Sequence, residues 1–125
     1  MSKHRAAVQL VRTLAEGVNL WGIPIYCLGE VLRVVTHHRV FTPPSPLEDA
    51  LLALQGLLES PSLRLLLPGE RYWTLFDQTL RRAEATGNLV YDAQIVALCI
   101  EHGVTSLISE DRDLLRFQDI TVRPI

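Results

Sequence analysis

The stretch from Asn88 to Phe117, NLVYDAQIVALCIEHGVTSLISEDRDLLRF, constrains the fold more than any other part of the chain. It opens with an apolar segment that stops at Gly103, as helices do where a glycine enters the left-handed region. The β-branched run 104–109 that follows is too short for a helix and predicts a strand. Sites in open α/β sheets form at the carboxyl ends of strands. Three acids stand at that end of this strand: Glu110, Asp111 and Asp113.

The rest of the chain alternates predicted helices with predicted strands. Apolar residues at helical spacing predict helices over residues 4–16, 28–36, 45–59 and 72–86. Short apolar runs predict strands over residues 23–27, 63–67 and 120–125. This alternation predicts an α/β fold, a three-layer α/β/α arrangement around a mostly parallel sheet. With 125 residues, the chain is expected to form one domain over residues 1–125, large enough for a core.

Composition and charge exclude several classes of protein. A hydrophobic fraction of 48% argues against disorder, and a net charge of -2 gives no sign of a nucleic-acid binder, although a local basic strip is compatible with it. Cys27 and Cys99 both lie in apolar runs, which is typical of reduced, buried thiols in a cytoplasmic protein. No apolar stretch approaches the length of a membrane span, and the N-terminus does not have the pattern of a targeting signal.

The acidic residues are predicted to gather at one edge of the sheet. Glu30 lies in the first turn of the helix that follows strand 23–27, and Asp111 and Asp113 follow strand 104–109. The carboxyl ends of parallel strands share an edge, so these side chains should converge there. Asp92 opens a helix that returns to the sheet, so the order of elements does not determine its place.

Converging carboxylates raise one another's pKa unless they share a cation. Mg²⁺ or Mn²⁺ fits oxygen ligands of this kind, and such an ion activates water and stabilises charge on a phosphoryl oxygen. That is the chemistry of a nuclease. The alternative interpretation has Glu30 and Asp92 in first helical turns because the helix dipole favours acids there, with residues 110–113 as a solvated loop. Trp21 and Trp73 have apolar neighbours, so we expect them to pack in a core or interface rather than stack on bases.

Three segments resemble the PIN-domain ribonucleases, and within them the VapC toxins of bacterial toxin–antitoxin pairs. LGEVLRVVTHHRVF is similar to the segment that carries an acid on the helix after the second strand. GNLVYDAQIVALCIEHG is similar to the segment with an aspartate at a helix start, and TSLISEDRDLLRF resembles the closing Ser/Thr-x-Asp/Asn motif. The resemblance runs from Arg5 to the end of the chain, with the three motifs in family order.

The resemblance implies an Mg²⁺- or Mn²⁺-dependent endoribonuclease toxin that cleaves RNA through metal-activated water. It makes Glu30, Asp92 and Asp111 the catalytic carboxylates and the metal ligands, with Asp113 as a fourth contributor. Which of Asp111 and Asp113 faces the ion is left open. Substrate contacts are expected from Ser109, Arg112 and His37. The implied partners are RNA, a VapB-like antitoxin and a second copy of the chain in a homodimer in the cytoplasm.

One departure from the family pattern concerns the N-terminus. PIN domains open with a strand that ends in an Asp-x-Asn-like motif, and residues 1–21 contain neither, so the domain reads as N-terminally shortened. A late start codon, gene degeneration and a deliberately shortened chain are three open explanations. The alternative function is therefore a catalytically impaired PIN remnant that acts only as a dimerisation or antitoxin-binding module. A response-regulator-like α/β domain is a third interpretation, which the order of the three motifs disfavours.

Overall fold

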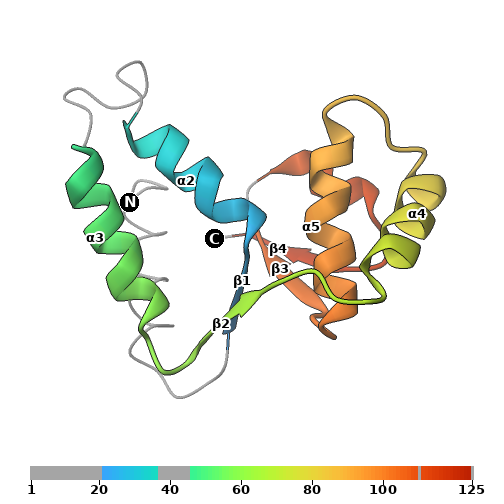
Figure 1. Ribbon diagram of the computed structural model, residues 1–125. Helices are drawn as coiled ribbons and strands as arrows, with labels where there is room; N and C mark the ends of the chain where they lie inside the picture. Colours follow the sequence, from blue (N-terminus) through green and yellow to red (C-terminus); the bar gives the residue numbers. More distant parts are fainter. Residues whose placement is uncertain (1–20, 37–45, 110, 125) are drawn as a thin grey trace. The chain divides into compact units, whose positions relative to one another are not determined.

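The computed structural model describes residues 21–36, 46–109 and 111–124 (Figure 1). The chain divides into two compact units, and of the described residues 21–65 fall in the first unit and 66–124 in the second. The predicted helix 4–16 and the loop that holds His37 lie outside the described residues. The single domain over residues 1–125 stays a prediction.

The first unit contains two strands and two helices: β1 (Trp21–Pro24), α2 (Tyr26–Thr36), α3 (Leu47–Leu58) and β2 (Leu63–Leu66, which ends at the unit boundary). β1 and β2 form a two-stranded sheet. The Trp21 backbone N–H donates to the Ser62 carbonyl oxygen at 3.0 Å, and its indole Nε1 donates to Ser62 Oγ at 3.1 Å. Trp21 is half-buried, and it does not belong to the buried core expected for it.

α3 begins at Leu47, later than the start at residue 45 that the sequence predicts. Pro46, with φ -58° and ψ 142°, is extended and stands just before the helix rather than inside it. Ala50 is buried, whereas three leucines of the helix are exposed: Leu47, Leu51 and Leu52. The leucine-rich sequence therefore leaves part of its apolar surface uncovered in this structure.

The second unit contains α4 (Tyr72–Ala83), α5 (Leu89–Glu101), β3 (Ser106–Ile108), the 3₁₀ helix η1 (Arg112–Arg116) and β4 (Thr121–Arg123). β3 and β4 are parallel, with Ser106 opposite Thr121 and Ile108 opposite Arg123. Within the described residues the strands pair two by two, β1 with β2 and β3 with β4. The parallel pairing of β3 with β4 agrees with the predicted parallel sheet.

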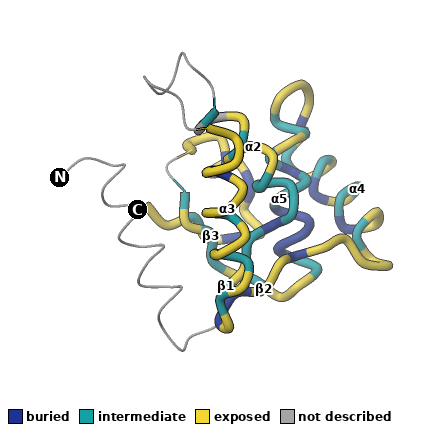
Figure 2. Tube along the Cα trace, turned by 60° about the vertical axis from the view of Figure 1, so that its left-hand side comes forward, coloured by how far each residue is buried: buried dark blue, intermediate teal, exposed yellow. Residues whose placement is uncertain are grey.

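α5 forms the centre of the core of this unit, as its apolar sequence predicts (Figure 2). Its most deeply buried residues are Ala93, Val96, Ala97, Leu98 and Cys99. The helix ends at Glu101, and Gly103 follows with φ 72°, the left-handed conformation expected of a helix stop. The Val104 N–H then donates to the Cys99 carbonyl oxygen at 2.8 Å, which closes the helix end.

Several boundaries and one side chain differ from the sequence-based expectation. The predicted strand 23–27 lies earlier, as β1 (Trp21–Pro24), and Tyr26 and Cys27 already belong to α2. Glu30 is therefore not in the first turn of its helix, as was predicted. α4 ends at Ala83 instead of residue 86, because Glu84 adopts φ 50° and the Ala85 N–H turns back to the Leu80 carbonyl oxygen at 2.9 Å. The predicted strand 104–109 is shorter, with only Ser106–Ile108 paired in β3. Trp73 is 68% exposed on α4, so its packing in a core is not seen; its ring contacts Phe76 edge-on.

Over the described part of the chain, we find no helix with the length and apolarity that a membrane span requires.

Candidate metal centre

Asp92 lies in the first turn of α5, at the border between the core and solvent. The following residue, Ala93, is fully buried, and the preceding residue, Tyr91, is exposed. Asp92 itself is half-buried. An acid in a first helical turn is favoured by the helix dipole, which accounts for its position in the sequence of α5. The direction of α5 then points this carboxylate at the end of the unit where η1 begins.

Two consecutive turns hold the second and third carboxylates. The Asp111 N–H donates to Ser109 Oγ at 3.0 Å, and the Asp113 N–H donates to Asp111 Oδ1 at 2.9 Å. Asp111 thereby caps η1, and Asp113 lies in its first turn. Leu114 and Phe117 are buried and anchor this segment to the core of the unit. The predicted acidic loop is therefore a capped 3₁₀ helix.

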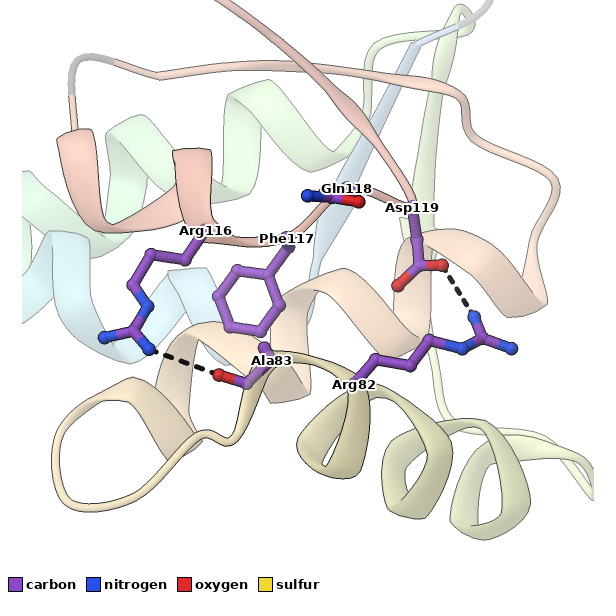
Figure 3. Close-up of a pocket in the computed structure, with 6 residues that line it drawn as sticks. All are labelled: Arg82, Ala83, Arg116, Phe117, Gln118 and Asp119. Carbon is purple, nitrogen blue, oxygen red and sulfur yellow. Dashed lines mark hydrogen bonds and ion pairs between the residues drawn. The ribbon is translucent and has the colours of Figure 1, made fainter.

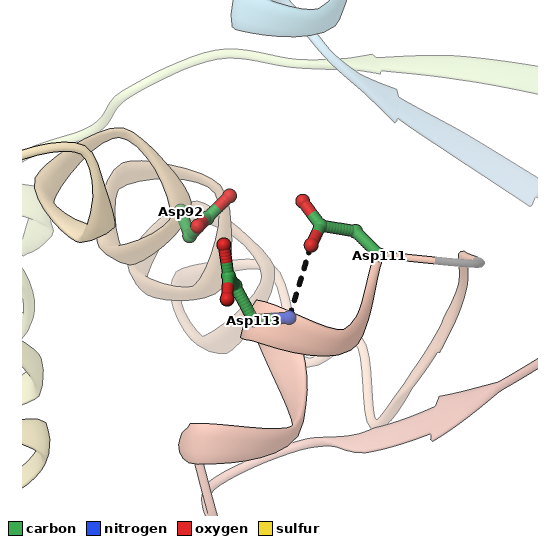
Figure 4. Close-up of side chains that lie close together, drawn as sticks. All are labelled: Asp92, Asp111 and Asp113. Atoms are coloured by element: carbon green, nitrogen blue, oxygen red, sulfur yellow. Dashed lines mark hydrogen bonds between the residues drawn. The ribbon is translucent and has the colours of Figure 1, made fainter.

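The three aspartates form one cluster (Figure 4). One carboxylate oxygen from each of Asp92, Asp111 and Asp113 lies within 4.8 Å of the other two. All three belong to the second unit. The order of elements left the position of Asp92 undetermined. In the structure Asp92 lies beside both Asp111 and Asp113.

The electrostatics of the cluster favour a cation. Burial raises the pKa of Asp92 above its ordinary value, and the charges of Asp111 and Asp113 raise that pKa further. Within the described residues no arginine forms an ion pair with these carboxylates. A shared divalent cation would offset the mutual repulsion. The donor set consists of carboxylate oxygens alone, which fits Mg²⁺ or Mn²⁺ and leaves coordination positions for water.

Glu30 lies on α2 in the first unit and is ion-paired within its own helix. Arg33 Nη2 lies 2.5 Å from Glu30 Oε1, and Arg33 Nε donates to Glu30 Oε2 at 3.2 Å. These hydrogen bonds from Arg33 lower the pKa of Glu30. Its convergence with the aspartate cluster stays a prediction.

The structure describes two of the three predicted substrate contacts. Ser109 is half-buried and accepts the Asp111 N–H, so its side chain supports the cluster directly. Arg112 is exposed on η1, between Asp111 and Asp113 in sequence. His37 lies outside the described residues.

Sequence reasoning missed the turns that position the cluster, although a signal was present. Ser109, Asp111 and Asp113 are spaced by two, and serine and aspartate side chains often accept the N–H two residues onward. Arg82 Nη1 also lies 2.6 Å from Asp119 Oδ1, a residue 37 positions away. No local pattern in the sequence indicates that long-range pair.

The chain has an α/β fold, and its three clustered carboxylates follow the end of a parallel strand. These features define a class of proteins with an acidic site whose oxygen atoms can bind a ligand. The chain belongs to the PIN-domain family, whose model matches residues 2–120. The resemblance drawn from the three motifs and the predicted PIN-like α/β fold class are thereby confirmed.

Several curated relatives are VapC ribonucleases. A VapC ribonuclease of Mycobacterium bovis is 39% identical over 114 residues, which cover 91% of this chain and 77% of the relative. The ribonuclease VapC43 of Mycobacterium tuberculosis matches to the same extent. The ribonuclease VapC48 of the same organism is 32% identical over 124 residues, 96% of this chain and 83% of the relative. The predicted kinship with VapC ribonucleases is therefore confirmed over most of the chain.

Proposed function

We propose that this chain is an Mg²⁺- or Mn²⁺-dependent endoribonuclease of the VapC type, folded as one PIN-like domain over residues 1–125. The observation that carries the proposal is the meeting of one oxygen each from Asp92, Asp111 and Asp113 within 4.8 Å. Membership of the PIN-domain family and the names of the relatives support ribonuclease activity.

The aspartate cluster would hold the ion, and Glu30 is the further carboxylate that we assign to it. When bound, Mg²⁺ or Mn²⁺ supplies an activated water and stabilises negative charge on a phosphoryl oxygen. Asp92 is the least exposed of the three ligands, and burial, followed by the charges of Asp111 and Asp113, raises its pKa. Asp111 has two tasks, since its Oδ1 accepts the Asp113 N–H while the rest of the carboxylate is available to the ion.

The substrate is RNA, and its backbone phosphate is held by side chains beside the cluster. Arg112 supports this assignment because it is exposed on η1 and stands between two of the three aspartates in sequence. A guanidinium binds a phosphate through two parallel hydrogen bonds. Ser109 and His37 are the other proposed substrate contacts.

The protein is further proposed to act in the cytoplasm as a homodimer that is inhibited by a VapB-like antitoxin. Three exposed leucines of α3, of which Leu52 is 69% exposed, support an apolar contact surface on the first unit.

The test is RNA cleavage by the purified chain with Mn²⁺, compared with the same reaction in excess EDTA and with Asp92→Asn. Cleavage should require Mn²⁺ and should fall by at least about a hundredfold in Asp92→Asn, because loss of even an outer-shell partner of a metal site typically costs about 10- to 100-fold. Asp77→Asn, which alters an exposed ion pair on α4, is the matched control and should retain activity. Cleavage that persists in Asp92→Asn rejects the site. A folded wild-type chain that leaves RNA intact supports the alternative, a remnant that only dimerises or binds an antitoxin.

A further inference from the structure

A polar hollow lies in the same unit as the aspartate cluster (Figure 3). Its volume is about 510 Å³, within the range of small-molecule pockets. It lies between the C-terminal end of α4 and the segment that joins η1 to β4. Its lining residues are Arg82, Ala83, Arg116, Phe117, Gln118 and Asp119.

Two long-range contacts hold the walls of this hollow in place. Arg82 Nη1 donates to Asp119 Oδ1 at 2.6 Å, and Arg116 Nη2 donates to the Ala83 carbonyl oxygen at 3.3 Å. The Phe117 ring is only 2% exposed and lies between the two arginine side chains in Figure 3. Each guanidinium carries five N–H donors, so both arginines retain donors for a ligand.

The balance of charge in the hollow argues against a simple anion site. The Arg82 charge is offset by Asp119, and Arg116 interacts with a carbonyl at the C-terminus of α4, where the helix dipole is negative. The lining therefore presents donors and acceptors side by side with little excess positive charge. A nucleobase edge, which also carries donors and acceptors side by side, fits this lining better than a phosphate does.

The hollow is also close in the fold to the aspartate cluster. Asp113 and Arg116 are three residues apart in η1, and residues at that spacing lie on the same side of a 3₁₀ helix, about 6 Å apart along its axis. At the other wall, Ala83 ends α4 and is followed by the connection that leads into α5, which carries Asp92. A single RNA strand at the aspartates can therefore extend toward this hollow.

We propose that the hollow is a subsite for an unpaired guanine base of the RNA strand, next to the phosphate that is cut. This inference rests on the proposed ribonuclease function. Arg82 or Arg116 donates to guanine O6 and N7, the commonest base-specific contact of arginine in nucleic-acid complexes. The Asp119 carboxylate and the Gln118 side-chain oxygen accept from the N–H groups of the same base. Single-stranded RNA is recognised through such edges because its bases are free of pairing.

The experiment measures binding of the full chain to labelled, uncleavable 2′-O-methyl oligouridine in EDTA by fluorescence anisotropy. A second probe carries one guanosine in the middle, and others carry adenosine, cytidine or an abasic site there. The guanosine probe should bind about tenfold more tightly than oligouridine, and the other three should not.

Two variants and a control separate base recognition from charge. Gln118→Ala and Arg116→Lys should reduce the guanosine preference to less than about threefold while they leave the affinity for oligouridine unchanged. Arg116→Lys keeps the charge but loses the planar fork of donors. Arg81→Gln, beside Arg82 but outside the hollow, should keep the full preference.

Each other outcome counts against the subsite. Equal affinity for all probes, preference for another base, or a preference that survives both variants overturns it and leaves the ribonuclease proposal standing. If Arg116→Lys retains full affinity and the abasic probe binds as well as the guanosine probe, the hollow is a phosphate contact instead. A wild-type chain that binds none of the probes overturns the subsite, while the ribonuclease proposal is decided by its own cleavage test. Guanosine-selective binding without Mn²⁺-dependent cleavage overturns the ribonuclease proposal and, with it, the placement of the base next to a cut phosphate.

Discussion

Asp92 is the residue at which the core of the second unit meets its acidic surface. Its helix places it beside fully buried Ala93, and the two aspartates of the η1 segment lie opposite. Burial and the two neighbouring charges act in the same direction and raise its pKa. In the absence of a cation, the ionised form of this side chain is a cost to the folded state.

The raised pKa predicts how stability depends on pH in the metal-free protein. An unfolded aspartate releases its proton near pH 3.9, whereas folded Asp92 releases it at higher pH. Between these values the folded state holds more protons, so the stabilisation is complete below the lower value and is lost as pH rises through the higher one. In EDTA at pH 7, Asp92→Asn should therefore melt at a higher temperature than the wild type, and the gap should close as pH falls toward 4. A wild type that melts at or above the variant at pH 7 contradicts this reading of the site.

Gly69 leaves room for a neighbouring carboxylate, that of Glu101. Glu101, at the end of α5, accepts the Gly69 N–H at 2.8 Å and the Arg71 N–H at 3.0 Å, which ties α5 to the start of α4. A Cβ at position 69 would lie 2.7 Å from Glu101 Oε2. The carboxylate would have to move and give up at least one of these bonds.

Gly69→Ala should lower the free energy of unfolding by about 1–2 kcal/mol, the lower part of the range for a hydrogen bond to a charged group, because both bonds are exposed. Gly56→Ala is the matched control, because its Cβ would meet nothing within 4 Å on α3, and it should stabilise the helix by up to about 1 kcal/mol. Urea unfolding measures both. In a Glu101→Ala background, Gly69→Ala should have little further effect; a full effect there would reject the proposed clash.

At the scale of elements, η1 determines where two of the three carboxylates lie. Its first turn is capped by Asp111, whose own N–H is held by Ser109 Oγ, and its buried face is fixed by Leu114 and Phe117. Ser109 is thus a positioning residue for the cluster in addition to a proposed substrate contact.

Ser109→Ala should weaken Mn²⁺ binding several-fold without unfolding the protein. The lost hydrogen bond is worth about 1 kcal/mol, and it holds the backbone of Asp111 rather than its carboxylate. Isothermal titration calorimetry measures the affinity, and Ser109→Thr, which keeps the hydroxyl, should restore it. Ser106→Ala is the control, since Ser106 Oγ is buried with no hydrogen-bond partner among the described residues. Unchanged affinity in Ser109→Ala would show that this hydroxyl does not position the cluster.

The presence of the helices was the most predictable part of the fold. The apolar run of α5 and the turn at Gly103 follow from local physics, because burial and left-handed glycine leave clear marks in a sequence. η1 was not predicted, since a single capped turn has no repeating apolar pattern. The early end of α4, just before Glu84, was not predicted either, because a non-glycine residue rarely adopts the left-handed conformation found there.

At the scale of the whole molecule, the sequence supplied the acidic candidates but did not predict which of them lie together. Asp92, Asp111 and Asp113 were all candidates, but their convergence depends on how α5 packs against η1, which is a long-range contact. Trp73 was predicted wrongly. Its apolar neighbours in the sequence suggested that it packs in a core or interface, but its side chain is exposed. Family membership is the most secure conclusion, since the PIN match spans residues 2–120. Glu30 is the carboxylate whose assignment to the site still depends on the resemblance.

The central claim is that Asp92, Asp111 and Asp113 together bind one catalytic divalent cation. The most direct measurement is titration of the full chain with Mn²⁺, with free Mn²⁺ followed by electron paramagnetic resonance. The wild type should bind one ion per chain, and Asp92→Asn and Asp113→Asn should each weaken that binding at least about tenfold, as removal of a ligand carboxylate is expected to do. Asp77→Asn should bind as the wild type does. Binding of Mn²⁺ with the same affinity and stoichiometry in the wild type and in both aspartate variants would contradict the claim.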